Sequence, residues 1–202
     1  MDMAGFLKME KVTVPEGNSG DWSIQKFTVT KEQASFFNIR NPLRPIEAGV
    51  YTRLSFKGQT VMSDTSAEMC DHFGVISLAR GRVLLNGLGI GMVLQACCLK
   101  PEVAHVTVNE ISEDVIKLVA PHYLQMFPDK VTINHADALT WKPNNGDKFD
   151  IIWHDIWNGI CADNYEQMKK LHLRYRHWGK WQGSWCRDEV RRAMRRDSLG
   201  IF

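Results

Sequence analysis

Several features that would place a protein in a special class are missing from this sequence of 202 residues. It has no run of about 18 apolar residues, so no membrane-spanning helix is expected. The first residues lack the basic start and apolar run of a signal peptide. Internal repeats and low-complexity tracts are also missing. We therefore expect an ordinary globular protein, cytoplasmic in location, with a single hydrophobic core.

The cysteines follow no metal-binding or redox pattern. There are five, an odd number, with no CxxC pair and no Cys/His ligand spacing: Cys70, Cys97, Cys98, Cys161 and Cys186. Free thiols in a reducing compartment are the expected state. We expect no metal site.

The formal net charge of +2 conceals an asymmetry along the chain. Residues 169–197 contain ten Lys and Arg against three Asp and Glu, whereas the rest contains 15 basic and 20 acidic residues. Tryptophans lie among these basic residues at positions 178, 181 and 185. Basic grooves with aromatic platforms bind single-stranded nucleic acid, although a solvated helix face is the more common origin of such a run.

The first 80 residues are predicted to form an extension that precedes the main fold. Turn residues and prolines up to about residue 45 indicate loops around short strands. Residues 49–64 alternate apolar and polar side chains on both sides of Lys57-Gly58, which predicts a β-hairpin. Residues 65–79 then favour a linker helix, with Thr65 or Ser66 as its cap.

Residues 81–160 have a pattern that indicates alternating strands and helices. Short apolar runs at 83–85, 105–110, 131–133 and 149–153 predict four strands, and helices are expected between them. This alternation predicts a Rossmann-like α/β fold with a mostly parallel sheet. We recognise no further strand in residues 161–202. That segment is predicted to be basic, Trp-rich and helical, with the sheet truncated after its fourth strand.

Three glycines follow the first of these strands, in the stretch VLLNGLGIGMVLQACC. At a strand–loop–helix junction, Gly87 allows a tight turn and Gly89 lets a ligand lie against the backbone. Gly91 allows close packing of helix and strand. Such a loop can also be purely structural, so other residues must indicate the ligand.

Acidic residues follow the next three strands. Glu110 ends the second strand, where a carboxylate can accept both hydroxyls of a ribose. Asp137 follows the third and is placed for an adenine amino group, although a helix cap is an alternative role. Asp155 follows the fourth. NAD is a rival ligand, but its sites favour GxGxxG, and the sequence Gly-Leu-Gly-Ile-Gly suits an adenosine ligand without phosphates better.

Four motifs in this order resemble the class I S-adenosylmethionine-dependent methyltransferases: VLLNGLGIG, HVTVNEIS, VTINHADAL and FDIIWHDIW. With the hairpin and the stretch TVMSDTSAEMCDH, they resemble the spermidine synthase-like branch, including small phage proteins. The resemblance covers roughly residues 50–158. It implies S-adenosylmethionine as the cofactor and Asp155 as the catalytic base. The cofactor-binding residues that it implies are Gly87, Leu88, Gly89, Gly91, Glu110, Ile111, Asp137, Ala138 and Asp155.

Two departures from the aminopropyltransferases bear on the reaction. Those enzymes have an aspartate at the position of Ile90, which favours a decarboxylated cofactor, and a second acid at the position of Asn158. Their loss favours methyl transfer to an unidentified, small acceptor. Aminopropyl transfer is the alternative, as is a non-catalytic protein that binds an adenosyl ligand. A homo-oligomer is possible with a sheet that ends early.

The neighbours of Asp155 allow more than one role. Strand alternation turns His154 to the opposite face, where packing is expected. Trp153 is expected in the core, although it could wall a substrate pocket together with Trp157. HDIWNG differs from the post-strand motif of amino-base methyltransferases, which disfavours a nucleic-acid acceptor.

Overall fold

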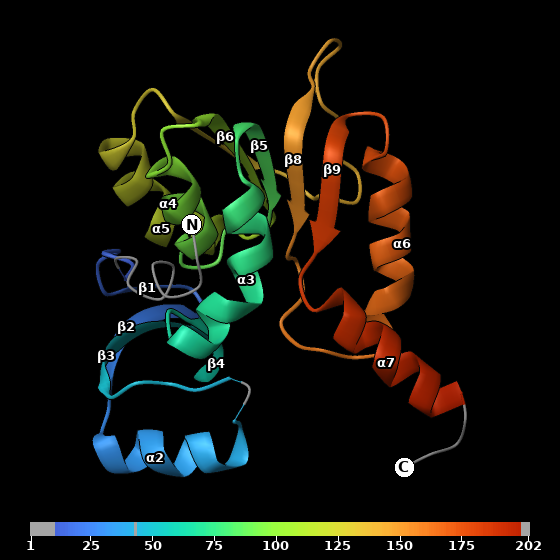
Figure 1. The fold of residues 1–202 in the computed structure, drawn as a ribbon. Coiled ribbons are helices and arrows are strands. Elements are labelled where there is room, and N and C mark those ends of the chain that lie inside the picture. Colours follow the sequence, from blue (N-terminus) through green and yellow to red (C-terminus); the bar gives the residue numbers. More distant parts are fainter. Residues whose placement is uncertain (1–10, 43, 199–202) are drawn as a thin grey trace.

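The computed structural model describes residues 11–42 and 44–198, which contain two sheets (Figure 1). The first is antiparallel, in the order β1-β2-β3-β4, and the second has five strands in the order β7-β6-β5-β8-β9. The first comprises β1 (Gly17–Ser19), β2 (Trp22–Val29), β3 (Gly49–Phe56) and β4 (Gln59–Ser63). The second comprises β5 (Gly81–Asn86), β6 (Val103–Glu110), β7 (Val131–His135), β8 (Phe149–His154) and β9 (Gly179–Ser184).

The second sheet confirms the predicted Rossmann-like fold. All its neighbouring strands pair in parallel, and β5 lies between β6 and β8. The chain moves outward from β5 through β6 to β7 and then returns to β8 on the other side. The topological switch point therefore lies between β5 and β8, which is where open α/β sheets bind ligands.

The sheet is not truncated after its fourth strand, contrary to the prediction. A fifth strand, β9, pairs in parallel with β8, so residues 161–202 are not wholly helical. This strand was not recognised in the sequence because it contains two glycines, which are uncommon inside strands. A Cβ on Gly179 would lie 2.6 Å from the Ile152 side chain, and one on Gly183 would lie 2.5 Å from the Trp181 ring. These glycines therefore make room for neighbouring side chains within a strand.

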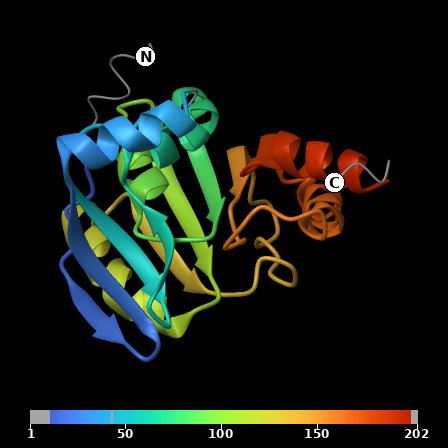
Figure 2. The same ribbon diagram turned by 90° about the horizontal axis from the view of Figure 1, so that it is seen from below.

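Helices cover both faces of the parallel sheet. The described residues contain the helices α2 (Lys31–Arg40), α3 (Ser66–Leu78), α4 (Met92–Cys98), α5 (Glu113–Met126), α6 (Asn164–Tyr175) and α7 (Arg187–Ser198), of which α2 packs on the N-terminal sheet instead. Helices α3, α4 and α5 lie on one face and α6 on the other (Figures 1 and 2). The larger apolar core includes Val83, Leu85, Ile151 and Trp153, on the α3–α5 side. Leu84 and Ile152, one residue along each strand, pack in a second cluster with α6.

The N-terminal sheet contains the predicted hairpin. Strands β3 and β4 pair across Lys57 and Gly58, which have φ values of 50° and 79°. Two successive positive φ angles are typical of a tight hairpin turn. The predicted linker helix is α3, with Thr65 at its N-cap. Helix α2 was not predicted, although its sequence carried a capping box: Thr30 and Gln33 satisfy each other's backbone N–H groups.

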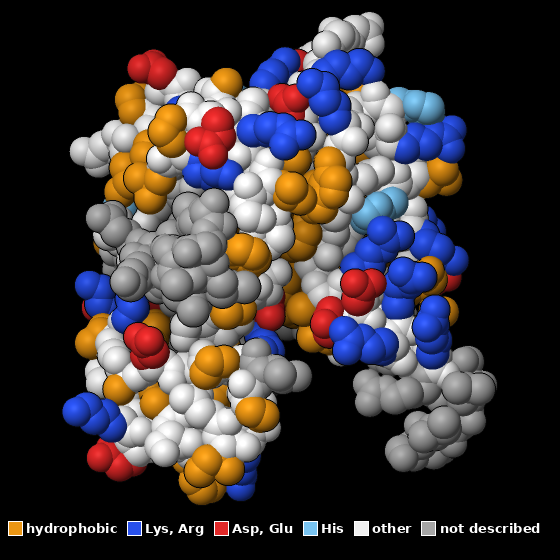
Figure 3. Space-filling view, in the orientation of Figure 1, with side chains coloured by type: hydrophobic (Ala, Val, Ile, Leu, Met, Phe, Trp, Pro, Cys, Tyr) orange, Lys and Arg blue, Asp and Glu red, His pale blue; other side chains and the backbone are white. Residues whose placement is uncertain are grey.

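Lys and Arg side chains gather over α6 and α7 (Figure 3). On α7 some of them are engaged within the helix itself: Arg191 pairs with Asp188 at 3.7 Å and Arg192 with Glu189 at 3.1 Å. Both arginines are exposed, as on a solvated helix face. No helix among the described residues is long and apolar enough to cross a membrane.

Candidate functional site

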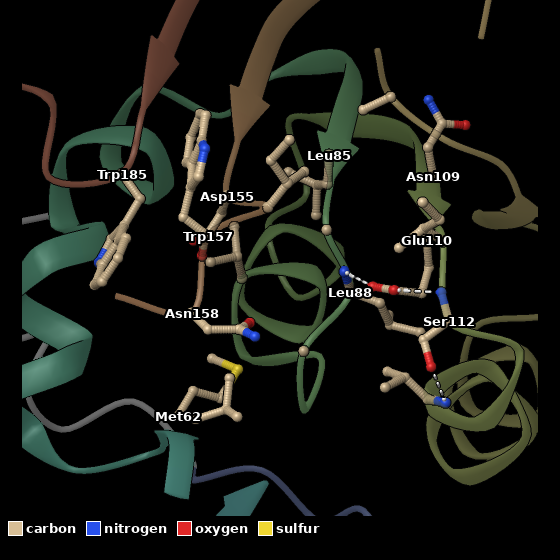
Figure 4. Close-up of a pocket in the computed structure, with 18 of the residues that line it drawn as sticks. Met62, Leu85, Leu88, Asn109, Glu110, Ser112, Asp155, Trp157, Asn158 and Trp185 are labelled. Carbon is tan, nitrogen blue, oxygen red and sulfur yellow. Dashed lines mark hydrogen bonds between the residues drawn. The ribbon is translucent and has the colours of Figure 1, made fainter. Parts of the chain in front are cut away.

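A cavity of about 390 Å³ lies at the carboxyl ends of the central parallel strands (Figure 4). Its size is within the range of small-molecule sites. Both sheets contribute to its wall. Among the residues that line it are Met62, Glu68, His72, Gly87, Leu88, Gly89, Asn109, Glu110, Ile111, Ser112, Asp137, Ala138, Leu139, Trp153, Asp155, Trp157, Asn158 and Trp185.

The glycine loop needs all three of its glycines. Gly87, Gly89 and Gly91 have φ values of 106°, 53° and 77°. A Cβ on Gly87 would lie 1.9 Å from the backbone oxygen of Asp155, and one on Gly91 would lie 2.0 Å from the Tyr123 ring. Gly87 and Gly89 line the cavity, whereas Gly91 is the N-cap of α4 and packs on Tyr123. The structure thus separates a packing role at Gly91 from the two positions that line the cavity.

Most backbone N–H groups of this loop already have partners within the protein. Gly87 donates to the Asn109 carbonyl at 2.8 Å, and Gly91 donates to the Leu88 carbonyl at 2.9 Å. Leu88 donates to Glu110, and Ile90 donates to the Met62 sulfur at 3.3 Å. A pyrophosphate is bound largely by free N–H groups of such a loop. The loop therefore suits a ligand without phosphates.

Glu110 is held at the end of β6 by two backbone donors. Its Oε2 accepts from Leu88 N at 2.9 Å and its Oε1 from Ser112 N at 2.8 Å (Figure 4). A carboxylate has about four acceptor positions, so two remain for other donors. The side chain is thus fixed beside the glycine loop with capacity to accept both hydroxyls of a ribose.

Four more of the predicted cofactor residues line the cavity: Leu88, Ile111, Asp137 and Ala138. Leu88, Ala138 and the exposed Ile111 contribute apolar wall. One oxygen of Asp137 accepts from Leu139 N at 2.8 Å, and its carbonyl accepts from the N–H groups of the next turn. Asp137 thus caps a turn and also lines the cavity, so the two roles considered for it are compatible.

Asp155 lies across the switch point from Glu110, directly after β8. Its side chain is 22% exposed. Desolvation, and after it the negative charges of Glu68, Asp71 and Glu110, raise the pKa of Asp155 to about 7. A carboxylate with a pKa near neutrality is suited to accept a proton from a substrate.

His72 of α3 is a site residue that the sequence analysis missed. Its Nε2 lies 3.7 Å from Asp155 Oδ2, and its side chain is almost fully buried. Burial lowers the pKa of His72 to about 4, so the ring is neutral near pH 7 and this contact is not an ion pair. Glu68 and His72 lie one helical turn apart, so both are on the same face of α3, but the sequence does not show that this face meets Asp155.

The aromatic residues divide between the core and the cavity wall. Trp153 is buried, as expected, and also lines the cavity; its ring stacks on Trp181 with centroids 6.4 Å apart. Trp157 and Trp185 line the same side of the cavity as Asp155 (Figure 4). Trp178 and Trp181 pack against the two apolar clusters. The three C-terminal tryptophans are therefore not an exposed stacking platform.

Comparisons with known proteins find likeness only at the level of structure. No family model and no curated protein matches the sequence. Similar solved structures include an S-adenosylmethionine-dependent methyltransferase from Clostridium acetobutylicum ATCC 824, with 16% identity, 55% of this chain and 44% of that chain covered, and a TM-score of 0.40. A proposed RNA methyltransferase from Pyrococcus horikoshii has 16% identity, covers 67% of this chain and 65% of its own, and gives a TM-score of 0.46.

A third similar structure is the plantazolicin methyltransferase BpumL in complex with SAH, with 17% identity and a TM-score of 0.39. The match covers 55% of this chain and 40% of that chain. The chain thus spans less than two thirds of the length of each of these proteins. At such identities the likeness is one of fold. What the chain does is argued below from the site itself. Among the described residues, no group of three or more His, Cys, Asp and Glu is arranged for a metal ion.

Proposed function

We propose that the chain binds S-adenosylmethionine and transfers its methyl group to a small-molecule acceptor. One observation carries the proposal: the Glu110 carboxylate is fixed beside the glycine loop at the switch point, with acceptor capacity left over. A loop whose N–H groups are mostly engaged, next to such a carboxylate, supports a nucleoside without phosphates.

The cavity fits such a cofactor. Gly87 and Gly89 line the cavity, and a Cβ on Gly89 would lie 2.1 Å from the Met62 sulfur, so a side chain there would displace part of the cavity wall. Glu110 would hold the ribose hydroxyls. Asp137 and Ala138 would contact the adenine, with Ile111 beside it.

When bound, S-adenosylmethionine supplies a methyl group that is already activated for transfer. The protein then has to orient a nucleophile, exclude water and accept a proton. Asp155 would take the proton of an amine or hydroxyl group on its carboxylate. The raised pKa of Asp155, about 7, supports that role, since the group can both accept and release a proton near neutral pH.

The acceptor is proposed to be small. Trp157, Asn158 and Trp185 line the cavity on the Asp155 side, and β4 of the N-terminal sheet contributes Met62 (Figure 4). The hairpin and helix α3 before the parallel sheet also support assignment to the spermidine synthase-like branch. Localisation in the cytoplasm, association into a homo-oligomer and a phage source remain expectations from the sequence.

Aminopropyl transfer is the second candidate, and one observation bears on it directly. The Ile90 side chain is fully buried in the larger apolar core, so it lies outside the cavity wall. The presence of isoleucine instead of an aspartate at position 90 is therefore weaker support for S-adenosylmethionine over the decarboxylated cofactor than the sequence suggested. A protein that binds the cofactor without turnover is the third candidate.

Titration calorimetry of the purified chain with S-adenosylmethionine, S-adenosylhomocysteine and the decarboxylated cofactor tests the proposal. We expect the first two to bind more tightly. Preference for the decarboxylated form would favour aminopropyl transfer, and methylthioadenosine as the product would confirm it. S-adenosylhomocysteine as the product with an acceptor panel would establish methyl transfer. Binding of none of the three would overturn all three candidates.

A further inference from the structure

A row of polar side chains crosses the whole parallel sheet, one strand after another. Asn134 Nδ2 of β7 donates to Asn109 Oδ1 of β6 at 3.0 Å, and Asn109 Nδ2 donates to Asn86 Oδ1 of β5 at 2.9 Å. Asn86 Nδ2 then lies 2.9 Å from His154 Nδ1 of β8. His154 Nε2 lies 3.2 Å from Gln182 Oε1 of β9. We call these five side chains the polar ladder.

The direction of the hydrogen bonds along the ladder determines which ring nitrogen of His154 carries the proton. Asn86 uses its carbonyl oxygen to accept from Asn109, so its NH₂ group faces the His154 ring. His154 Nδ1 must therefore accept, and Nε2–H must donate to Gln182. Gln182 continues the same direction, since its Nε2 donates to the His172 carbonyl at 2.8 Å. His154 is fully buried, which favours this neutral form.

On β5 and β8 the ladder interrupts an apolar surface. Side chains of a parallel sheet are usually apolar on both faces. Two residues earlier on the same face of the sheet, Leu84 and Ile152 are buried among apolar neighbours. Buried polar groups cost free energy unless every one has a partner, and an apolar row would avoid that cost. The row lies near the carboxyl ends of the strands, and Asn109 in it also lines the cavity.

Ladder residues are also bonded through their backbones to the residues of the site. The carbonyl of Asn109 accepts from Gly87 N at 2.8 Å, and that of Asn86 accepts from Asp155 N at 2.8 Å. Glu110, Gly87 and Asp155 are each the next residue after a ladder residue. If one strand shifted against its neighbour, ladder hydrogen bonds would break and, at the same time, a residue of the site would move.

We propose that His154 and Asn86 are positioning residues that set the location of Asp155 relative to Gly87 and Glu110. The inference rests on the proposed function for what Asp155 does, but the ladder itself can be tested without an acceptor. Because the ladder spans the switch point, it fixes the distance between the ribose side of the cavity and the proton acceptor. Neither residue touches the cavity wall; each acts through the residue that follows it.

The first test is the tautomer of His154 in the wild-type protein, read from the ¹⁵N shifts of its ring. We expect protonation at Nε2 with Nδ1 unprotonated. Protonation at Nδ1, or a charged ring near pH 7, would overturn the ladder as described. This result requires no variant and no ligand.

The second test compares His154→Gln with His154→Leu. A glutamine amide can accept from Asn86 and donate to Gln182, whereas leucine can do neither. We expect the carboxyl ¹³C titration of Asp155 to shift by about one pKa unit in His154→Leu and affinity for S-adenosylhomocysteine to fall about tenfold, with both restored in His154→Gln. A folded His154→Leu protein with an unchanged titration and affinity would overturn the proposal.

Gln182→Leu provides the same comparison at a half-buried position, should His154→Leu fail to fold. It removes the acceptor of His154 Nε2–H and leaves Asn86 untouched. We expect a smaller shift of the Asp155 titration in the same direction; no shift would count against the proposal. If wild type binds no S-adenosyl ligand, the proposed function fails, while the tautomer and the Asp155 titration still decide the ladder.

Discussion

The two ends of the cavity differ in how their residues are distributed along the chain. The end with Glu110 and the glycine loop is built from residues 87–139, at the ends of three consecutive strands. The end with Asp155 combines residues of the N-terminal sheet, of α3 and of the segment after β9. Only the first end has a compact sequence motif. Local patterns therefore indicate the cofactor more readily than the acceptor.

Gly87→Ala should have the largest effect on this arrangement, because it forces the two ends apart. Its Cβ would collide with the Asp155 backbone, and its φ of 106° strains any side chain. We expect the free energy of unfolding to fall by about 4 kcal/mol. Gly159→Ala is the matched control, since a Cβ there meets nothing within 4 Å. Equal urea midpoints for the two variants would refute the contact.

Glu110→Ala should disable the first end alone. Loss of charge-assisted hydrogen bonds to a ribose should weaken binding of S-adenosylhomocysteine roughly 100-fold, about 3 kcal/mol. Calorimetry measures the change. Glu113→Ala removes an exposed carboxylate that pairs with Lys117 at 3.0 Å, and it should bind as wild type does. Unchanged affinity in Glu110→Ala would remove the ribose role.

Asp155→Asn should disable the second end while sparing cofactor binding. Folding raises the pKa of Asp155 from 3.8 to about 7, so the ionised form is disfavoured in the folded state. As the pH rises from 3.8 to about 7, ionisation of Asp155 progressively lowers the free energy of unfolding, and the whole loss is present above pH 7. The difference in stability between Asp155→Asn and wild type should therefore be more favourable to the variant at pH 8 than at pH 3. We expect a change of roughly 2 kcal/mol, since partial exposure of the side chain screens the effect.

Chemical denaturation of both proteins at the two pH values measures that difference. A difference that does not change with pH would mean that Asp155 titrates normally. Turnover in Asp155→Asn, once an acceptor is known, would exclude Asp155 as the base.

Trp185→Ala should have the smallest effect on cofactor affinity. Trp185 lies across the cavity from Glu110 and Ser112 (Figure 4). We expect binding of S-adenosylhomocysteine to change by less than about threefold, under 1 kcal/mol. A loss as large as that of Glu110→Ala would show that the two ends are not separate.

The same division explains what could be predicted from the sequence. The hairpin, the linker helix and four strands were marked by alternation and by turn residues such as Lys57-Gly58. Strand β9 was missed because its glycines look like breakers, and only the neighbouring Trp181 and Ile152 side chains explain them. His72 was missed because nothing in a helix pattern shows which residue will face a strand 80 positions later. Long-range packing, not local propensity, assembles that end.

One consequence of the glycine loop concerns how the protein would distinguish ligands. Its amide groups at Gly87, Leu88, Ile90 and Gly91 are bonded within the protein, so the loop is preorganised before any ligand arrives. Little ordering entropy is then lost on binding, and little attraction for anions remains. Affinity should consequently vary little with ionic strength, and selection among nucleosides should depend on shape.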